Sequence, residues 1–526
     1  MTVVSGWLEN RPFWQTAAFS FVAGLLLAAT FAPVHFIFLL PVCFAGLLIL
    51  LQRATNKKQA FFIGWWFGFG QFIAGLYWIG VAFTIDANAH AALIPVPTII
   101  LPACLAIFSG LATLAVYQSK ATGLSRILLF TGIWTLLEYV RGLLFTGFPW
   151  NLTGYAWGDH LAALQWTAHI GIYGLTLFTI LISSLPAILA EPNINSRQKR
   201  GVILLDCALL FLLVGTGYLR LQSDPLPLME NTDIRVVQPN NEQKNKWRGE
   251  TRFRHVKNLM DLSRQDGFEG RHWVWPETAL PFFLTTDTRL QDYIAPRLPS
   301  GKAVITGAAR SDPNVRKYWN SVQALSSDGK IKGIYDKRHL VPYGEYLPIR
   351  DFFKKSGIAS LIPALDNMSD FSFPAQDMKK VTHYNTLPPA RTLICYEVAF
   401  PWEVAAPEHF DWILNVTNDA WFGNTSGPYQ HFVISRTRAI EQGVALIRSA
   451  NKGVSAIIDG YGRILAKNNP GKAGILDGQI PAPLGNRPLY ARFGEAIPIT
   501  LLTIILSLAS LLTKWQAPIG RNQRLK

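Results

Sequence analysis

The sequence is poor in charged residues and in cysteine. Only 16% of its 526 residues are Asp, Glu, Lys or Arg, against about 25% in ordinary soluble domains. Four residues are cysteine, and neither a CxxC nor an HExxH metal-binding motif occurs. No basic run is interleaved with aromatic residues, so the net charge of +15 does not indicate nucleic-acid binding. We therefore expect no metal, no cofactor and no nucleic-acid partner.

The shortage of charge is uneven along the chain. Residues 1–217 contain 10 Lys/Arg and 6 Asp/Glu, whereas residues 218–493 contain 35 and 27. The mean hydropathy of +0.20 therefore blends two unlike parts. We predict a membrane domain over 1–217, an extramembrane domain over 218–493, and a C-terminal membrane helix with a basic tail over 494–526.

Eight apolar stretches meet or approach the roughly 20 residues that a membrane-spanning helix needs. They are 14–32, 35–52, 60–82, 92–117, 127–145, 161–190, 202–219 and 496–513. The second is short and contains Pro41. The stretch 161–190 is long and contains Pro186, so we expect it to be tilted or broken.

The loops between these stretches alternate in charge. Basic residues occupy every second loop and both ends of the chain, and the loops around 33–34, 83–91 and 146–160 contain no Lys or Arg. Short basic loops stay in the cytoplasm. We therefore expect both termini in the cytoplasm and residues 218–493 on the opposite side of the membrane.

Some polar and aromatic residues in or near the spans invite a functional interpretation. Glu138 and Arg141 are one helical turn apart and could pair within the membrane, either as a polar lining for a lipid headgroup or as a purely structural ion pair. Trp150, Tyr155 and Trp157 are expected as anchors at the membrane interface.

The extramembrane region alternates short apolar runs with amphipathic stretches. Strand-like runs are 234–238, 273–275, 303–306, 393–396, 412–416 and 454–458, and helix-like stretches are 250–265 and 428–442. This alternation predicts a layered α/β or α+β domain.

One cysteine, Cys395, lies in that domain, at the end of an apolar run. A lone thiol is either an inert buried residue or a reactive nucleophile, and a thiol needs a base or a nearby cation to become the nucleophilic thiolate. Glu277, within a collar of Trp and Pro, is the candidate base. Lys337, after another apolar run, is the candidate cation for an oxyanion. Taken singly, Glu277 is better explained as a capping carboxylate and Lys337 as a surface charge.

Together, the order Glu277, Lys337, Cys395 resembles the nitrilase (carbon–nitrogen hydrolase) superfamily, whose fold is an αββα sandwich. The segments 335–348, 395–397, 418–423 and 427–431 are similar to those of the apolipoprotein N-acyltransferase family, which also has eight membrane spans. Two departures are Tyr343, where the family commonly has Phe, and Lys452. The resemblance implies a helical membrane domain joined to a nitrilase-like sandwich.

The resemblance also implies roles: Glu277 as general base, Lys337 as oxyanion stabiliser and Cys395 as nucleophile. Supporting or substrate-binding roles are implied for the residues Trp247, Glu345, Tyr396 and Glu397. Glu345 and Glu397 are expected to orient Lys337 or share its charge, and Trp247 either walls an acyl chain or packs in the core. We interpret His339 and His431 as structural.

The implied activity is transfer of an acyl chain from a membrane phospholipid, through a Cys395 thioester, to the α-amine of a diacylglyceryl-modified N-terminal cysteine of a lipoprotein. The implied location is the bacterial inner membrane, with the catalytic domain in the periplasm. A membrane-tethered amidase or nitrilase with the same triad is the nearest alternative. A transporter or receptor with an inactive nitrilase-like domain is a more distant one.

Overall fold

The computed structural model describes residues 12–86, 90–191, 194–246, 249–267, 269–312, 314–348, 350, 355 and 370–516. The chain divides into two compact units. The helical unit comprises residues up to 77, 95–223 and from 493 onward. The α/β unit comprises residues 78–94 and 224–492.

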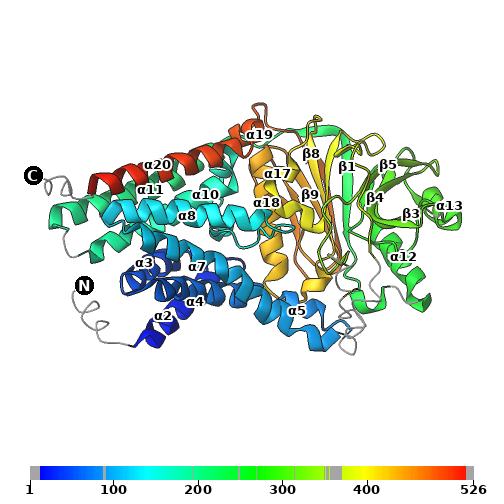
Figure 1. Ribbon diagram of the computed structural model, residues 1–526. Helices are drawn as coiled ribbons and strands as arrows, with labels where there is room; N and C mark the ends of the chain where they lie inside the picture. The colour runs from blue at the N-terminus through cyan, green and yellow to red at the C-terminus, as the bar shows by residue number, and fades with distance from the viewer. Residues whose placement is uncertain are drawn as a thin grey trace, which may run out of the picture. The chain divides into compact units, whose positions relative to one another are not determined.

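The helical unit is built from long apolar helices that lie side by side (Figure 1). Its main helices are α2 (Phe13–Ala28), α3 (Leu39–Leu51), α4 (Lys57–Leu76), α7 (Leu101–Ser119), α8 (Gly123–Leu143), α10 (Thr167–Ser184), α11 (Ser196–Leu221) and α20 (Ala496–Gln516). In the described part of the chain, five helical segments are long and apolar enough to cross a membrane, and α2 and α3 are shorter apolar helices. The predicted fold class, with a multi-pass helical domain beside an α/β domain, is therefore confirmed, whereas the bounds 1–217 and the number of eight spans stay predictions.

The long stretch at 161–190 is broken, as its length and Pro186 suggest. A short helix, α9 (Leu161–Leu164), precedes α10, and the 3₁₀ segment η4 (Leu185–Ala190) follows it with Pro186 in its first turn. Within α10, Gly171 has a positive φ of 66°. Because only glycine adopts that conformation freely, it accommodates the kink there.

Glycines allow the helices α2, α4 and α7 to pack with their backbones close together. A Cβ atom at Gly24 of α2 would lie 2.0 Å from the carbonyl oxygen of Phe67 on α4. A Cβ at Gly64 of α4 would lie 2.3 Å from the carbonyl oxygen of Ser109 on α7. Small residues at such crossings allow dispersion contacts between backbones, which hold helices together in lipid.

Replacing Gly24 with alanine is therefore expected to destabilise the helical unit by about 2 kcal/mol or more, because the backbone carbonyl of Phe67 cannot move aside cheaply. Thermal unfolding in one detergent measures the effect. The matched control is Gly46→Ala on α3, where a Cβ atom meets nothing within 4 Å. This control is expected to be neutral or stabilising by up to about 1 kcal/mol. Equal unfolding midpoints for the two variants would contradict the close-packing interpretation.

Glu138 and Arg141 are buried, and each side chain forms hydrogen bonds with residues of the segment 148–153. The carboxylate of Glu138 accepts hydrogen bonds from the backbone and hydroxyl of Thr153 (3.0 and 2.7 Å) and from Trp134. The guanidinium of Arg141 donates to the carbonyls of Phe148 and Trp150 at 2.7 and 2.8 Å. Both side chains therefore hold the loop at 148–153, because its backbone groups need partners away from water.

The expected interface anchors are wrong. Trp150, Tyr155 and Trp157 are all nearly fully buried inside the helical unit. The indole of Trp157 donates to the hydroxyl of Thr179 at 2.8 Å. These aromatic side chains pack the interior, where their polar atoms find partners.

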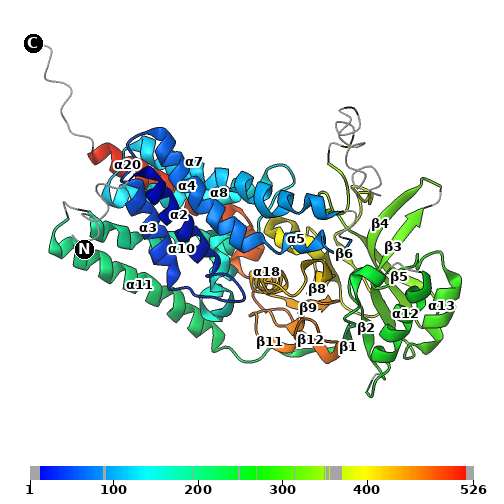
Figure 2. The same cartoon turned by 90° about the horizontal axis from the view of Figure 1, so that it is seen from below.

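The α/β unit contains two six-stranded sheets (Figure 2). The first has the order β12-β1-β2-β3-β4-β5 and the second β11-β10-β9-β8-β7-β6. The strands of the first sheet are β1 (Leu228–Gln238), β2 (His272–Val274), β3 (Ala303–Asp312), β4 (Lys317–Ser326), β5 (Ile331–Asp336) and β12 (Gly474–Pro481). Those of the second are β6 (Val381–Thr382), β7 (Ala390–Ile394), β8 (Trp412–Thr417), β9 (Ala445–Ala450), β10 (Ser455–Ile458) and β11 (Ile464–Asn468).

The two sheets pack face to face between helices, in four layers. Val274 of β2 joins a core shared with residues of the second sheet such as Leu414. Its neighbours Trp273 and Trp275 point to the other face, into a core with α12 (Gly249–Ser263) and α13 (Thr288–Ile294). This alternation follows from the two-residue repeat of a strand. Helix α18 (Gly427–Gln442) packs on β9 of the second sheet. The predicted nitrilase-like sandwich is therefore confirmed.

The α/β unit also includes the segment Trp78–Ile94, which lies between α4 and α7 in the chain. The indole of Trp78 donates to the side-chain oxygen of Gln430 at 3.2 Å and packs edge-on against Phe422. The apolar stretch 60–82 is therefore not one continuous helix. Helix α4 ends at Leu76, and the chain continues into the short helix α5 (Ile79–Ala82).

Candidate active site

The three residues of the predicted triad each follow the end of a strand. Glu277 follows β2, Lys337 follows β5 directly, and Cys395 follows β7 directly. All three are buried, with exposed fractions between 1% and 9%. The backbone N–H of Lys337 donates to the carbonyl of Asn320 on β4, which extends the β4–β5 pairing to the lysine itself. The sheets thus set the position of each residue.

Lys337 lies between two carboxylates. Its Nζ is 2.8 Å from Oε2 of Glu345 and 3.7 Å from Oε1 of Glu277. Burial alone would lower the pKa of Lys337, but the charges of Glu345 and Glu277 outweigh burial and leave it well above its ordinary value. The lysine is therefore a permanent cation in this site. Glu345 was expected to orient Lys337, and its carboxylate contacts the ammonium directly.

A residue that the sequence did not single out joins the two carboxylates. The side-chain amide of Asn320 donates to Glu277 and to Glu345, at 2.8 Å in each case. The other oxygen of Glu277 accepts from the backbone N–H of Asn418 at 2.9 Å. Asn418 lies in a segment that the family resemblance covers, but Asn320 lies in an ordinary strand and carries no motif signal. The carboxylate of Glu277 is thus oriented from both sides.

Cys395 has an unusual backbone conformation. Its φ of +51° lies in the left-handed region that side-chain-bearing residues rarely adopt. Burial is the main cause of a raised thiol pKa, Glu277 raises it further, and Lys337 lowers it. In this arrangement the proton stays on sulfur, and a base must remove it before the sulfur can act as a nucleophile.

Glu397 bonds to the backbone beside Lys337 and beside Cys395. Its carboxylate accepts from the backbone N–H groups of Arg338 and Ile394, both at 2.7 Å. It therefore links the residue after Lys337 to the residue before Cys395, so it orients the backbone beside Lys337 through those hydrogen bonds. Its charge is nevertheless near enough to influence Lys337 electrostatically.

Of the remaining predicted site residues, the structure describes Tyr396, which follows Cys395 in the chain. The ring of Tyr396 packs edge-on against His339 and Phe400. His339 stacks on Phe400 and pairs with Glu403 at 2.8 Å. Trp247 lies outside the described residues, so its expected role remains a prediction.

A second buried lysine lies beside the cluster. Lys246 donates from Nζ to the hydroxyl of Thr278, the residue after Glu277, at 2.5 Å. Burial lowers the pKa of Lys246 to about 8, and the charge of Glu277 raises it in part. In the sequence, only the position of Lys246 next to Trp247 indicates that this lysine lies near the site.

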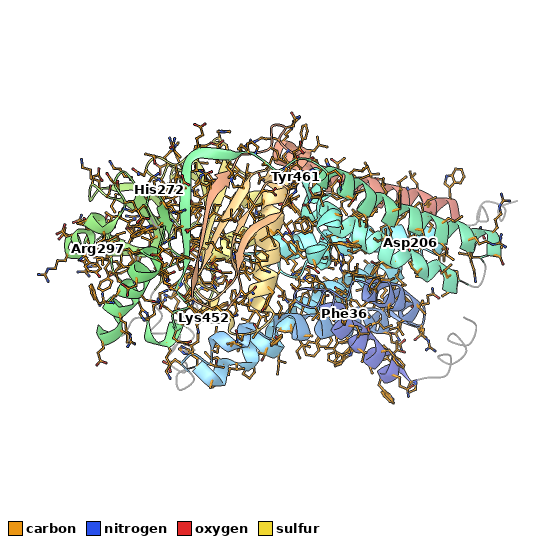
Figure 3. All side chains as sticks on the ribbon, turned by 180° about the vertical axis from the view of Figure 1, so that it is seen from behind. Phe36, Asp206, His272, Arg297, Lys452 and Tyr461 are labelled. Carbon is orange, nitrogen blue, oxygen red and sulfur yellow. The ribbon has the colours of Figure 1, made fainter. Side chains whose placement is uncertain are left out.

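The two departures from the family pattern lie at the surface. Tyr343 is 56% exposed. Lys452, which is labelled in Figure 3, is partly exposed and forms an ion pair with Glu242. Neither departure alters the Glu277, Lys337 and Cys395 cluster.

The cluster contains a thiol, a carboxylate oriented by two donors, and a fixed cation. These are the components for nucleophilic attack on an acyl carbon: a nucleophile, a base and an oxyanion stabiliser. Within the described residues, no group of three His, Cys, Asp or Glu side chains is arranged to hold a metal ion.

Both units of the chain match families of known proteins. The α/β unit with its two sheets is a carbon–nitrogen hydrolase-like domain, and residues 235–486 match the family model described as carbon-nitrogen hydrolase. A CN-hydrolase superfamily protein from Xanthomonas campestris covers 53% of this chain and 97% of its own, at 19% identity and a TM-score of 0.33.

Residues 23–185 match the family model described as the apolipoprotein N-acyltransferase N-terminal domain. The apolipoprotein N-acyltransferase of Rhodopseudomonas palustris is 37% identical over 95% of this chain and 96% of its own length. That of Bradyrhizobium diazoefficiens is 36% identical over 94% and 95%. The chain belongs to the apolipoprotein N-acyltransferase family.

Proposed function

We propose that this protein transfers an acyl chain from a membrane phospholipid to the α-amine of the diacylglyceryl-modified N-terminal cysteine of a lipoprotein, through a thioester on Cys395. The observation that carries the proposal is the burial of Cys395, Glu277 and Lys337 in one cluster, in a chain whose other unit consists of membrane-type helices. Membership of the acyltransferase family supports the choice of acceptor.

In the first half-reaction, Glu277 takes the thiol proton and the Cys395 sulfur attacks the ester carbonyl carbon of the phospholipid. Lys337 stabilises the negative charge that develops on the carbonyl oxygen. The carbon–oxygen bond then breaks, and the proton passes from Glu277 to the leaving oxygen. The products are a lysophospholipid and an acyl-thioester on Cys395.

In the second half-reaction, the neutral α-amine of the lipoprotein attacks the thioester carbon. Glu277 takes a proton from the attacking nitrogen, the carbon–sulfur bond breaks, and that proton returns to the sulfur. An amide forms and the thiol is restored. Glu277 thus acts as base and then as acid in each half-reaction.

The proposed reaction requires a site at a membrane, because both proposed substrates carry acyl chains. Bringing an acyl chain into water costs about 0.8 kcal/mol per CH₂ group. We propose that residues 1–217 and 494–526 lie in the bacterial inner membrane with both termini in the cytoplasm. Residues 218–493 then form the periplasmic catalytic domain, as the alternation of basic loops suggests.

The experiment supplies radiolabelled phospholipid and a diacylated lipopeptide to the detergent-solubilised protein. N-acylated lipopeptide supports the proposal. Release of free fatty acid without acylated peptide, or of ammonia from an amide substrate, favours the membrane-tethered hydrolase with the same triad. No turnover of any of these substrates favours a non-catalytic binding protein and contradicts the proposal.

A further inference from the structure

A buried histidine contacts the main chain of Cys395. Nε2 of His431, on helix α18, lies 3.2 Å from the carbonyl oxygen of Cys395. A carbonyl oxygen only accepts, so the ring donates this hydrogen bond from a protonated Nε2. His431 is fully buried, and this contact is with the backbone of Cys395.

The other side of the ring is fixed by two charged residues. Nδ1 of His431 lies 2.9 Å from Oδ1 of Asp419, and Nη2 of Arg448 lies 2.9 Å from Oδ2 of the same carboxylate. Arg448 also approaches Nδ1 at 3.1 Å. Arg448 and His431 outweigh the effect of burial and lower the pKa of Asp419 to about 2, so this carboxylate stays ionised.

The helix and loop residues around His431, Asp419 and Arg448 restrict the positions of these three side chains. Helix α18 has Pro428 in its first turn and ends at Gly443, whose φ of +66° is the usual left-handed helix end. A Cβ atom at Gly453 would lie 1.9 Å from Oδ2 of Asp419, so only glycine admits the carboxylate there. The orientation of His431 is thus set by its own helix α18, by the segment that contains Asp419, and by strand β9, which carries Arg448.

The backbone conformation of Cys395 needs contacts that stabilise it. A left-handed conformation at a residue other than glycine persists only where the surroundings hold it. The φ and ψ angles of Cys395 set the direction in which its carbonyl oxygen points. A hydrogen bond to that oxygen therefore restrains the backbone of the residue that carries the thiol.

We infer that His431 is a positioning residue, which holds the Cys395 backbone in its left-handed conformation through the carbonyl oxygen and is itself oriented by Asp419 and Arg448. This inference rests on the proposed role of Cys395 as the nucleophile. It assigns His431 no part in proton transfer.

Two conservative variants separate the contacts of the ring. In His431→Gln, the amide nitrogen can occupy the place of Nε2 and keep the bond to Cys395. In His431→Asn, it can occupy the place of Nδ1 and keep only the contact with Asp419. We expect H431N to lower the rate of Cys395 acylation on the order of 10- to 100-fold at little change in KM, and H431Q to lower it less than about 5-fold.

A second readout needs no lipid substrate: the rate at which iodoacetamide alkylates Cys395, resolved by mass spectrometry. H431N is expected to change this rate several-fold relative to H431Q, whereas Cys104 and Cys207, both exposed, react as in the wild type. If no variant or wild-type protein transfers acyl groups but this alkylation pattern holds, the proposed function fails and the positioning role stands.

Equal alkylation and acylation rates for H431N and the wild type would overturn the inference. So would equal losses in H431N and H431Q that follow their losses of thermal stability. Should H431N not fold, Asp419→Asn takes its place. This variant keeps the histidine but weakens its orientation, and unchanged alkylation of Cys395 in it would overturn the inference as well.

Discussion

Replacing Cys395 with alanine is expected to abolish acyl transfer, with a loss on the order of 10⁴-fold or more. No other thiol lies in the Glu277 and Lys337 cluster, because Cys43, Cys104 and Cys207 belong to the helical unit. The measurement uses phospholipid with a radiolabelled acyl chain and no acceptor. The wild-type protein should retain up to one acyl group per chain, and hydroxylamine should release it.

The matched control for this experiment is Cys207→Ser on α11, which removes an exposed thiol from the helical unit. It is expected to trap label as the wild type does. Label that remains covalently bound to the C395A variant would show that the acyl group is carried elsewhere, and the thioester mechanism would have to be abandoned.

Glu277→Gln is expected to lower the rate of Cys395 acylation on the order of 10³-fold. Glutamine keeps the size of the side chain and an oxygen that can accept from the backbone of Asn418, but it cannot take the thiol proton. Lys337 retains Glu345 at 2.8 Å, so the cation stays paired. The loss therefore reports on the base and is best measured as a single-turnover acylation rate.

Glu242→Gln is the control, since Glu242 is an exposed carboxylate that pairs with Lys452 at the surface. Its acylation rate is expected to match that of the wild type. An E277Q variant that keeps more than about a tenth of the wild-type rate would exclude Glu277 as the general base.

Much of the fold could be predicted from local sequence patterns. The apolar runs at 234–238, 303–306 and 412–416 lie within β1, β3 and β8, and the stretch 428–442 lies within α18. These predictions succeed because a strand or helix imposes its repeat on consecutive residues. Strand β11 was missed because most of its side chains are exposed and their burial hardly alternates.

Contacts between distant residues could not be predicted in this way. The amide of Asn320 reaches Glu277 across 43 positions in the chain, and Trp78 reaches Gln430 across 352. Such pairs have no common local pattern, and their side chains meet only when the sheets and helices are assembled. The hydrogen bonds of Glu138 and Arg141 with backbone groups of the loop that follows their helix have the same origin.

The sequence by itself determined that the chain combines apolar helices with a charged α/β region, and that Glu277, Lys337 and Cys395 each end an apolar run. These properties depend on composition and on neighbouring residues, which a sequence records directly. Only the folded chain brings Glu277 and Lys337 near Cys395, places Asn320 and Lys246 beside them, and sets His431 against the backbone of Cys395. The reason is that strand pairing and packing, and not sequence distance, set which polar groups must satisfy one another once water is excluded.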